Sequence, residues 1–234
     1  MNQNEFKIAL NDLEINITDE QLNHLEIYYN LLVEWNEKMN LTGIIQKEEV
    51  YLKHFYDSLT ICKVIDLNKI DSLCDVGTGA GFPGMVLKIL FPNLHITLVD
   101  SLQKRLTFLE TVKNEIGLTK LEIIHSRAEE YGTQNREKFD VVTARAVAPL
   151  NILLEYSIPM VKKDGYFIPL KANVSEELNN SMNAIKQLSV KLENKEEFLL
   201  PVENSQRTIL LLKKIENTQK KFPRKYSDIK KKPL

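Results

Sequence analysis

Cysteine and histidine are scarce in this sequence. Of 234 residues only two are cysteines, Cys62 and Cys74, which lie twelve positions apart and form no C-x-x-C pair. The four histidines occur singly, without the short spacing typical of metal ligands. We therefore expect a reduced protein without a disulfide framework and without a bound metal.

Long apolar runs are also missing. No stretch of about 18 consecutive apolar residues is present, so the sequence contains no signature of a transmembrane helix. Residues 1–16, MNQNEFKIALNDLEIN, mix acidic, polar and apolar side chains, which is not the pattern of a secretory signal peptide. These observations predict a cytoplasmic protein that does not bind membranes.

The chain as a whole has no large excess of one charge, because it contains 31 basic and 32 acidic residues. Taken alone, the net charge of −1 argues against a nucleic-acid partner. The charge is unevenly placed, however. Residues 1–60 carry 4 basic and 11 acidic groups, whereas residues 213–234 carry 9 basic and 2 acidic groups. This distribution permits a polyanionic partner at the C-terminal end and disfavours one at the N-terminal end.

The first 65 residues have helical periodicity. Thr18, with Gln21 three positions later, has the pattern of a capping box. Apolar and aromatic residues then recur every three or four positions, which predicts an amphipathic helix that packs one face on another element. These residues are Leu22, Leu25, Tyr29, Leu32, Trp35 and Met39. A second helical pattern covers residues 48–65.

From residue 70 onward, short apolar strands alternate with helical segments. The expected strands are 73–76, 95–100, 121–125, 139–143, 166–170, 190–192 and 208–212. The expected helices are 83–90, 102–116 with Ser101 as its N-cap, 150–158 and 175–187. This alternation predicts an α/β fold with a mainly parallel sheet covered by helices on both faces.

A glycine-rich loop, Asp75-Val-Gly-Thr-Gly-Ala-Gly-Phe-Pro-Gly84, joins the first of these strands to a helix. Glycines permit positive φ angles and a close backbone approach to a ligand, and the helix N-terminus adds partial positive charge. The dinucleotide-binding fingerprint G-x-G-x-x-G requires a third glycine where this chain has Phe82. The loop therefore disfavours an NAD-dependent oxidoreductase.

Acidic residues near this loop favour a cationic, nucleotide-like ligand instead. A carboxylate at Asp75 suits an ammonium group better than a pyrophosphate, and Phe82 suits an apolar wall. Asp100 ends the next strand, where it is placed to accept hydrogen bonds from two ribose hydroxyls. We therefore predict S-adenosylmethionine, whose sulfonium and amino groups are cationic, as the ligand.

Two later strand ends add to this site, because ligands of open α/β sheets bind at the carboxyl ends of the strands. Ser126-Arg-Ala-Glu129 follows the third strand, where a backbone amide and a small side chain are suited to an adenine edge. Ala144-Arg-Ala146 follows the fourth strand, and we expect it to place the Arg145 guanidinium over the mouth of the pocket.

Six motifs occur in one order along residues 20–212. They are Trp35-Asn36 with Asn40-Leu41-Thr42, His54 with Asp57-Ser58, the glycine-rich loop 75–84, Asp100-Ser101 with Lys104-Arg105, Ser126-Arg-Ala-Glu129 and Ala144-Arg-Ala146. In this set and order the chain resembles the glucose-inhibited division protein B family, which are bacterial 16S rRNA guanine-N7 methyltransferases.

The resemblance implies a Rossmann-like class I methyltransferase fold, with a seven-stranded, mainly parallel sheet and an N-terminal helical extension. We accordingly expect an extension over residues 1–65, a methyltransferase domain over 66–214 and a basic tail over 215–234. The resemblance also implies S-adenosylmethionine as methyl donor and N7 of guanine 527, in the decoding region of 16S rRNA, as acceptor. The cofactor contacts carried over by motif are Gly77, Phe82, Ala128, Glu129 and Arg145, to which the ribose argument adds Asp100.

Contact with 16S rRNA, free or within the 30S particle, requires cations near the pocket. The candidates are Arg145, Lys171, Lys104, Arg105, Arg207, Arg224 and Lys225. The tail agrees with the family at both of its ends but not over residues 226–229, so a folded tail and a flexible basic arm both stay open.

The implied chemistry explains why no catalytic acid or base is recognisable. Guanine N7 has a free in-plane lone pair and no proton, so its methylation needs no general base. We assign no catalytic residue and expect a monomer. Three other functions stay open: a methyltransferase acting on another RNA, a small molecule or a protein; an assembly factor without activity; and the NAD-dependent oxidoreductase that Phe82 disfavours.

Overall fold

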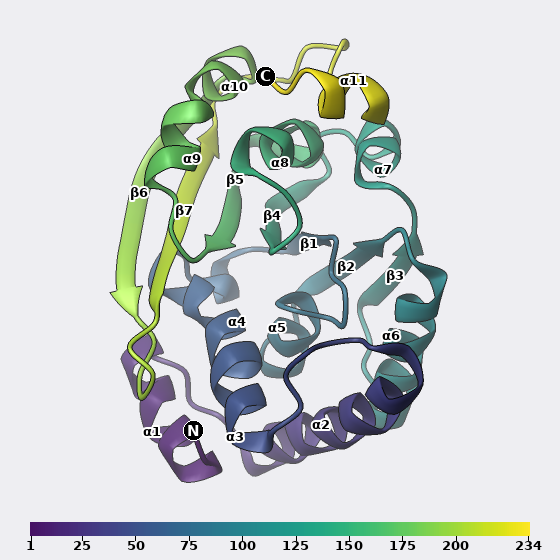
Figure 1. Cartoon of the computed structure of the whole chain (residues 1–234), viewed down its shortest axis with the longest axis vertical. Helices are drawn as coiled ribbons and strands as arrows, with labels where there is room; N and C mark the ends of the chain where they lie inside the picture. The colour runs from purple at the N-terminus through teal and green to yellow at the C-terminus, as the bar shows by residue number, and fades with distance from the viewer.

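The computed structural model describes residues 1–234 and has a seven-stranded sheet in the order β3-β2-β1-β4-β5-β7-β6 (Figure 1). Strands β1 to β5 are parallel, whereas β7 runs antiparallel to both β5 and β6. The strands are β1 Ser72–Val76, β2 His95–Asp100, β3 Leu121–His125, β4 Phe139–Arg145, β5 Val161–Lys171, β6 Val190–Leu199 and β7 Gln206–Lys214. The predicted α/β fold with a mainly parallel sheet is confirmed.

Helices cover both faces of this sheet. The α-helices are α1 Gln3–Leu10, α2 Asp19–Met39, α3 Lys47–Val50, α4 Asp57–Leu59, α5 Gly84–Leu90, α6 Gln103–Ile116, α7 Ala128–Gln134, α8 Leu150–Ser157, α9 Ser175–Asn180, α10 Met182–Gln187 and α11 Tyr226–Lys231. Single turns of 3-10 helix are η1 Asn11–Leu13, η3 Thr60–Lys63, η4 Leu67–Lys69 and η5 Ile158–Met160, and a π-helical segment is η2 Tyr51–Tyr56.

Alternate residues of each central strand enter two different cores. In β1, Leu73 packs in the core formed with α2, α5 and α6. Its neighbours Cys74 and Val76 pack in the core formed with α7, α8 and α10. The near-continuous apolar character of these strands therefore follows from burial on both faces.

The N-terminal helices share a core with the sheet. Thr18 Oγ1 accepts from Gln21 N at 3.1 Å and Thr18 N donates to Gln21 Oε1 at 3.0 Å, so the predicted capping box is present. Helix α2 packs on α5 and α6 (Figure 1). The helical pattern predicted over 48–65 is confirmed to residue 63, although it is divided into α3, η2, α4 and η3.

Two details of the predicted helices are corrected. Ser101 does not cap α6, because Leu102 is the N-cap and its amide donates to the Asp100 carboxylate at 2.9 Å. The helix predicted over 175–187 is divided at Ser181, whose hydroxyl donates to the Glu177 carbonyl at 2.6 Å. Back-bonding of this kind bends helices, which explains the interruption.

The C-terminal segment, residues 215–234, folds back beside α8 (yellow in Figure 1). Phe222 is buried in the core on that face of the sheet. The Arg136 guanidinium donates to three backbone carbonyls of the segment. Arg224 donates to the fully buried carboxylate of Glu155 through Nε at 2.8 Å and Nη2 at 2.6 Å. Of the two alternatives left open, the tail is therefore the folded one.

Residues from 1–65 and 66–214 contribute side chains to one continuous core. Neither of the boundaries predicted near residues 65 and 214 separates two hydrophobic cores. The division into domains at these residues stays a prediction. No helix has both the length and the apolar character needed to cross a membrane.

Candidate functional site

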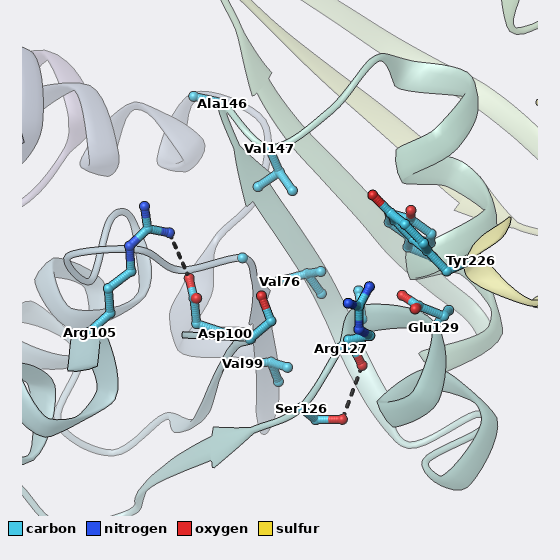
Figure 2. Close-up of a pocket in the computed structure, with 14 residues that line it drawn as sticks. Val76, Val99, Asp100, Arg105, Ser126, Arg127, Glu129, Ala146, Val147 and Tyr226 are labelled. Carbon is cyan, nitrogen blue, oxygen red and sulfur yellow. Dashed lines mark hydrogen bonds and ion pairs between the residues drawn. The ribbon is translucent and has the colours of Figure 1, made fainter. Parts of the chain in front are cut away.

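A cavity of about 410 Å³ opens at the carboxyl ends of the parallel strands (Figure 2). Loops that follow β1, β2, β3 and β4 all contribute to it, as expected for a ligand site in an open α/β sheet. We call it the first cavity. Its lining residues are Val76, Gly77, Val99, Asp100, Ser101, Arg105, Ser126, Arg127, Ala128, Glu129, Ala146, Val147, Tyr156 and Tyr226.

Gly77 brings the backbone of the glycine-rich loop to the wall of this cavity. Its φ is +68°, a conformation that side-chain-bearing residues rarely adopt. A Cβ at this position would lie 2.6 Å from Val147 Cγ2, which is far inside van der Waals contact. The loop can therefore approach a ligand here only because residue 77 is glycine.

The buried Asp75 side chain stabilises the glycine-rich loop through hydrogen bonds. Its fully buried carboxylate accepts through Oδ2 from Thr78 Oγ1 at 2.7 Å and from Gly84 N at 2.9 Å. Burial raises the pKa of Asp75 to about 6, and the two hydrogen bonds oppose that rise. The expected contact of Asp75 with a ligand ammonium group is corrected, because the side chain lies behind the loop and does not line the first cavity.

Asp100 lies where the sequence predicted, in the cavity lining at the end of β2. Its Oδ2 accepts from Gly79 N at 2.9 Å, and Arg105 Nη1 lies 3.4 Å from the same oxygen. Its Oδ1 accepts from Leu102 N. The carboxylate thus connects the glycine-rich loop to the start of α6, and Arg105 faces it across the cavity wall (Figure 2).

The first two residues of α7, Ala128 and Glu129, follow the loop after β3 and also line the cavity. Glu129 is only 7% exposed, yet its carboxylate has no hydrogen-bond or ion-pair partner in the chain. Such a group is suited to a donor on a ligand. Arg127, from the same loop, lies over the ring of Tyr226 with Cζ 4.9 Å from the ring centroid.

Phe82 and Arg145 lie beside the first cavity and are not part of its lining. The Phe82 ring stacks on His54, with 4.3 Å between centroids, and on Tyr28 at 5.6 Å. Arg145 Cζ lies 5.1 Å from the Phe82 centroid. The Tyr28 hydroxyl donates to the Ala80 carbonyl, so the N-terminal helices brace the glycine-rich loop through these aromatic contacts.

A second cavity, of about 500 Å³, adjoins the first, and Ala146 lines both. Asp57 lies in its lining between two arginines: Oδ2 accepts from Arg145 Nη1 at 2.9 Å and Oδ1 accepts from Arg207 Nε at 2.8 Å. The cationic residues of this lining are Lys53, Arg145, Lys171 and Arg207. The structure therefore brings together three of the cations predicted to contact RNA.

The other charges of the second cavity are also paired. Lys171 Nζ donates to Glu177 Oε2 at 2.8 Å and to the Ala148 carbonyl at 2.8 Å. Burial lowers the pKa of His54 to about 3, and the neighbouring Arg145 guanidinium lowers it further. The imidazole is therefore neutral at physiological pH and adds no charge to the lining.

The remaining cations predicted to contact RNA differ in availability. Lys104 and Lys225 are exposed and form no ion pair, whereas Arg105 is turned toward Asp100 in the first cavity. Arg224 is engaged by Glu155, which is fully buried. The guanidinium of Arg224 is thus used within the fold, and its contact with RNA stays a prediction.

Sequence reasoning missed four residues of the first cavity, one of which is Val99 on β2. Val147, Tyr156 and Tyr226 come from the loop after β4, from α8 and from α11. None belongs to a motif, and Tyr226 lies in the part of the tail that departs from the family pattern. Only the folding of the tail onto α8 brings its ring to the cavity.

S-adenosylmethionine fits the chemistry of the first cavity. The Asp100 and Glu129 carboxylates suit hydroxyl and amino donors, while the backbone at Gly77 leaves room for the ligand. The sheet order, the glycine-rich loop after β1 and the acidic end of β2 define a Rossmann-like S-adenosylmethionine-dependent methyltransferase.

Solved structures share this fold. One is an S-adenosylmethionine-dependent O-methyltransferase from Thermotoga maritima, with a TM-score of 0.54 at 15% identity over 80% of this chain and 73% of that one. Another is a mutant of the 16S rRNA (adenine(1408)-N(1))-methyltransferase from Catenulisporales acidiphilia, with a TM-score of 0.52 at 14% identity over 66% and 87%.

Closer relatives give the family. The family described as rRNA small subunit methyltransferase G matches residues 21–210. The chain is 50% identical to the ribosomal RNA small subunit methyltransferase G of Bacillus subtilis strain 168, over 100% of this chain and 99% of the relative. It is 46% identical to that of Listeria monocytogenes, over 100% of both chains. The chain belongs to the rRNA small subunit methyltransferase G family, and the resemblance in its six motifs is confirmed.

Proposed function

We propose that this protein transfers a methyl group from S-adenosylmethionine to N7 of a guanine in 16S rRNA, at the family's guanine 527. One observation carries the proposal: a cavity suited to the cofactor meets a second cavity lined by four cations, and Ala146 forms their common wall. Bound S-adenosylmethionine supplies an electrophilic methyl group. The second cavity receives the nucleotide that accepts it.

On the cofactor side, Gly77, Asp100, Ala128 and Glu129 contact the ligand directly. Phe82 and Arg145 support the site from behind, since the Phe82 ring and the Arg145 guanidinium lie between the glycine-rich loop and the N-terminal helices. This division of roles follows the cavity lining, in which the first four residues are present and the last two are absent.

Catalysis depends on positioning guanine N7 against the methyl group of the cofactor. N7 has a lone pair in the plane of the base and loses no proton, so no side chain acts as a general base. Orienting the two reacting atoms contributes roughly 7–11 kcal/mol to lowering such a barrier. The methylated guanine gains positive charge, and Asp57 and Glu177 offset the cations that surround it.

The RNA approaches across the second cavity. Lys171 and Arg207 hold its phosphates together with Arg145. Lys104 and Lys225, which are exposed, add contacts outside this cavity. We further propose that the enzyme works as a monomer in the cytoplasm.

A transfer assay tests the proposal. The protein is incubated with methyl-labelled S-adenosylmethionine and either 30S subunits or naked 16S rRNA that lacks the modification, and the labelled base is mapped. We expect label at N7 of one guanine. Label on another atom would change the chemistry, and absence of label from RNA would remove the proposed substrate.

Two lysine variants make the assay specific to the second cavity. Lys171→Gln is expected to raise the KM for RNA severalfold, because it removes a cation of the lining. Lys162→Gln is the control, since Lys162 pairs with Asp140 at the opposite edge of the sheet. Equal effects of the two substitutions would contradict the placement of RNA at the second cavity.

A further inference from the structure

The C-terminal helix α11 supplies an aromatic side chain to the first cavity. Tyr226, its first residue, lines the cavity at the end formed by residues 126–129. Figure 2 shows the ring, carried by the yellow ribbon of the tail, above Arg127 and Glu129. The family match ends at residue 210, so this contact comes from outside the matched region.

Strong local contacts hold α11 in this place. Arg224, two residues before Tyr226, forms a double hydrogen bond with the buried Glu155 carboxylate, and its amide donates to the same group at 2.9 Å. Ile229, within α11, is fully buried. The helix is therefore anchored on both sides of the cavity-facing ring, which makes Tyr226 a fixed part of the wall.

The Tyr226 ring is fixed but not covered. It remains 41% exposed, and its hydroxyl has no hydrogen-bond partner in the chain. Arg127 stacks on it at 4.9 Å, so a planar cation and an aromatic ring form one layered surface beside the cavity. A surface of this kind suits a flat aromatic base.

We propose that the Arg127–Tyr226 pair forms the wall against which the adenine of S-adenosylmethionine packs, so that the C-terminal tail completes the cofactor site. The location supports this choice, because residues 126–129 follow β3, where the adenine end of the ligand is expected, while Asp100 lies on the side of the cavity away from Tyr226 (Figure 2). This inference rests on the proposed cofactor and is independent of which RNA atom is methylated.

Isothermal titration calorimetry with S-adenosylhomocysteine tests the wall without any transfer reaction. Tyr226→Ala is expected to raise the Kd about five- to tenfold, the usual scale for loss of an aromatic contact. Tyr226→Phe is expected to stay within about twofold of the unmodified protein, because the ring and not the hydroxyl makes the wall. An unchanged Kd in Tyr226→Ala, or an equal loss in Tyr226→Phe, would overturn the proposal.

A double-mutant cycle tests whether the two residues act together. After Arg127→Ala, the further change Tyr226→Ala is expected to have less than about a twofold effect on the Kd, because the layered surface is already lost. Fully additive losses would contradict a shared wall. Lys230→Ala is the matched control on α11, since Lys230 lies near the same ring at 5.8 Å but does not line the cavity.

These measurements separate the inference from the proposed function. Wild-type protein that binds S-adenosylhomocysteine but transfers no label to 16S rRNA would refute the RNA substrate and leave the wall standing. Wild-type protein that methylates guanine N7, together with a Tyr226→Ala variant of unchanged Kd, would refute the wall alone. Thermal melting of each variant confirms that the fold is intact before binding is compared.

Discussion

Asp57 and Arg145 form a buried ion pair, with 2.9 Å between Oδ2 and Nη1, although 88 positions separate them in the chain. The same carboxylate accepts from Arg207 on β7 through its other oxygen. One side chain from the N-terminal helices therefore connects the ends of two strands beside the second cavity. The N-terminal helices therefore contribute directly to the lining of the second cavity.

Removing this carboxylate should be strongly destabilising. Asp57→Ala removes the shared partner of two guanidinium groups, at a position where the Asp57 side chain is only 8% exposed. We expect a loss of about 3–5 kcal/mol in the free energy of unfolding, the cost typical of breaking a buried pair. Urea unfolding followed by circular dichroism measures it.

The matched control is Glu34→Ala, which removes an exposed ion pair with Lys38 on α2. A surface pair of this kind contributes less than about 1 kcal/mol. Similar midpoints for Asp57→Ala and Glu34→Ala would show that Asp57 does not hold the strand ends together.

A methyl group at residue 77 should damage cofactor binding directly. Gly77→Ala places Cβ 2.6 Å from Val147 and also strains a backbone with φ of +68°, so the loop must move away from the cavity wall. We expect at least a tenfold rise in the Kd for S-adenosylhomocysteine, measured by calorimetry.

Gly117→Ala separates the strain from the site. Gly117 has a φ of +75° at the end of α6, and a Cβ there meets nothing within 4 Å. This variant should lose about 1–2 kcal/mol of stability from backbone strain while its Kd stays unchanged. A comparable rise in Kd for both variants would mean that strain alone, and not the approach to the ligand, explains the loss.

Neighbouring cations of the tail should behave in opposite ways. Lys225→Gln removes an exposed charge that has no ion-pair partner, so RNA affinity should fall and the slope of log affinity against log salt should lessen by about 0.7. Filter binding of an rRNA fragment over a range of salt concentrations measures both. An unchanged slope would remove Lys225 from the RNA surface.

Arg224→Ala should instead lower stability, because it leaves the Glu155 carboxylate buried without its partner. The expected loss is about 3–5 kcal/mol. It is measured by urea unfolding, and limited proteolysis should show earlier cleavage of the tail. A stable variant with a reduced salt slope would show instead that Arg224 contacts RNA.

The pH dependence of stability should carry the signature of His54. Its pKa is about 3 in the folded protein against an ordinary 6.5, chiefly because it is buried. As pH falls below 6.5 the unfolded state takes up a proton that the folded state refuses, so the free energy of unfolding decreases. His54→Gln removes this loss, and its stability should decline less between pH 7 and 4.5, by about 2 kcal/mol in urea unfolding.

Asp75 supplies the control with the opposite sign. Its pKa is raised from 3.8 to about 6, so the folded state binds a proton before the unfolded state does as pH falls through this window. Asp75→Asn therefore removes a gain in stability on acidification. The free energy of unfolding of this variant should decline more steeply with falling pH than that of the unmodified protein. Parallel pH profiles for all three proteins would contradict both assignments.

Much of the fold is encoded in local patterns. The alternation of strands and helices from residue 70, the capping box at Thr18 and the ending of α6 at Gly117 all depend on residues close together in the chain. The glycine-rich loop and Asp100 are local in the same sense. Their positions in the cavity follow from the rule that parallel strands present their carboxyl ends to one edge.

Boundaries and breaks were harder to predict, because a backbone group can be satisfied by more than one side chain. The amide of Leu102, the N-cap of α6, donates to the Asp100 carboxylate and not to Ser101. Ser181 divides a helix because its hydroxyl donates to the carbonyl of Glu177. In both cases the sequence shows which groups can donate or accept a hydrogen bond. It does not show which donor pairs with which acceptor.

The six motifs in the sequence determined the class of protein, and the alternation of strands and helices determined the edge of the sheet at which the two cavities lie. Only the tertiary structure decided which distant charges pair with each other. Asp57 with Arg207 and Arg224 with Glu155 are pairs joined over 150 and 69 positions. The same folding decided between a folded tail and a flexible arm, and it placed Tyr226 in the lining of the first cavity. Local sequence cannot encode such choices, because burial and pairing depend on which distant segments the fold brings together.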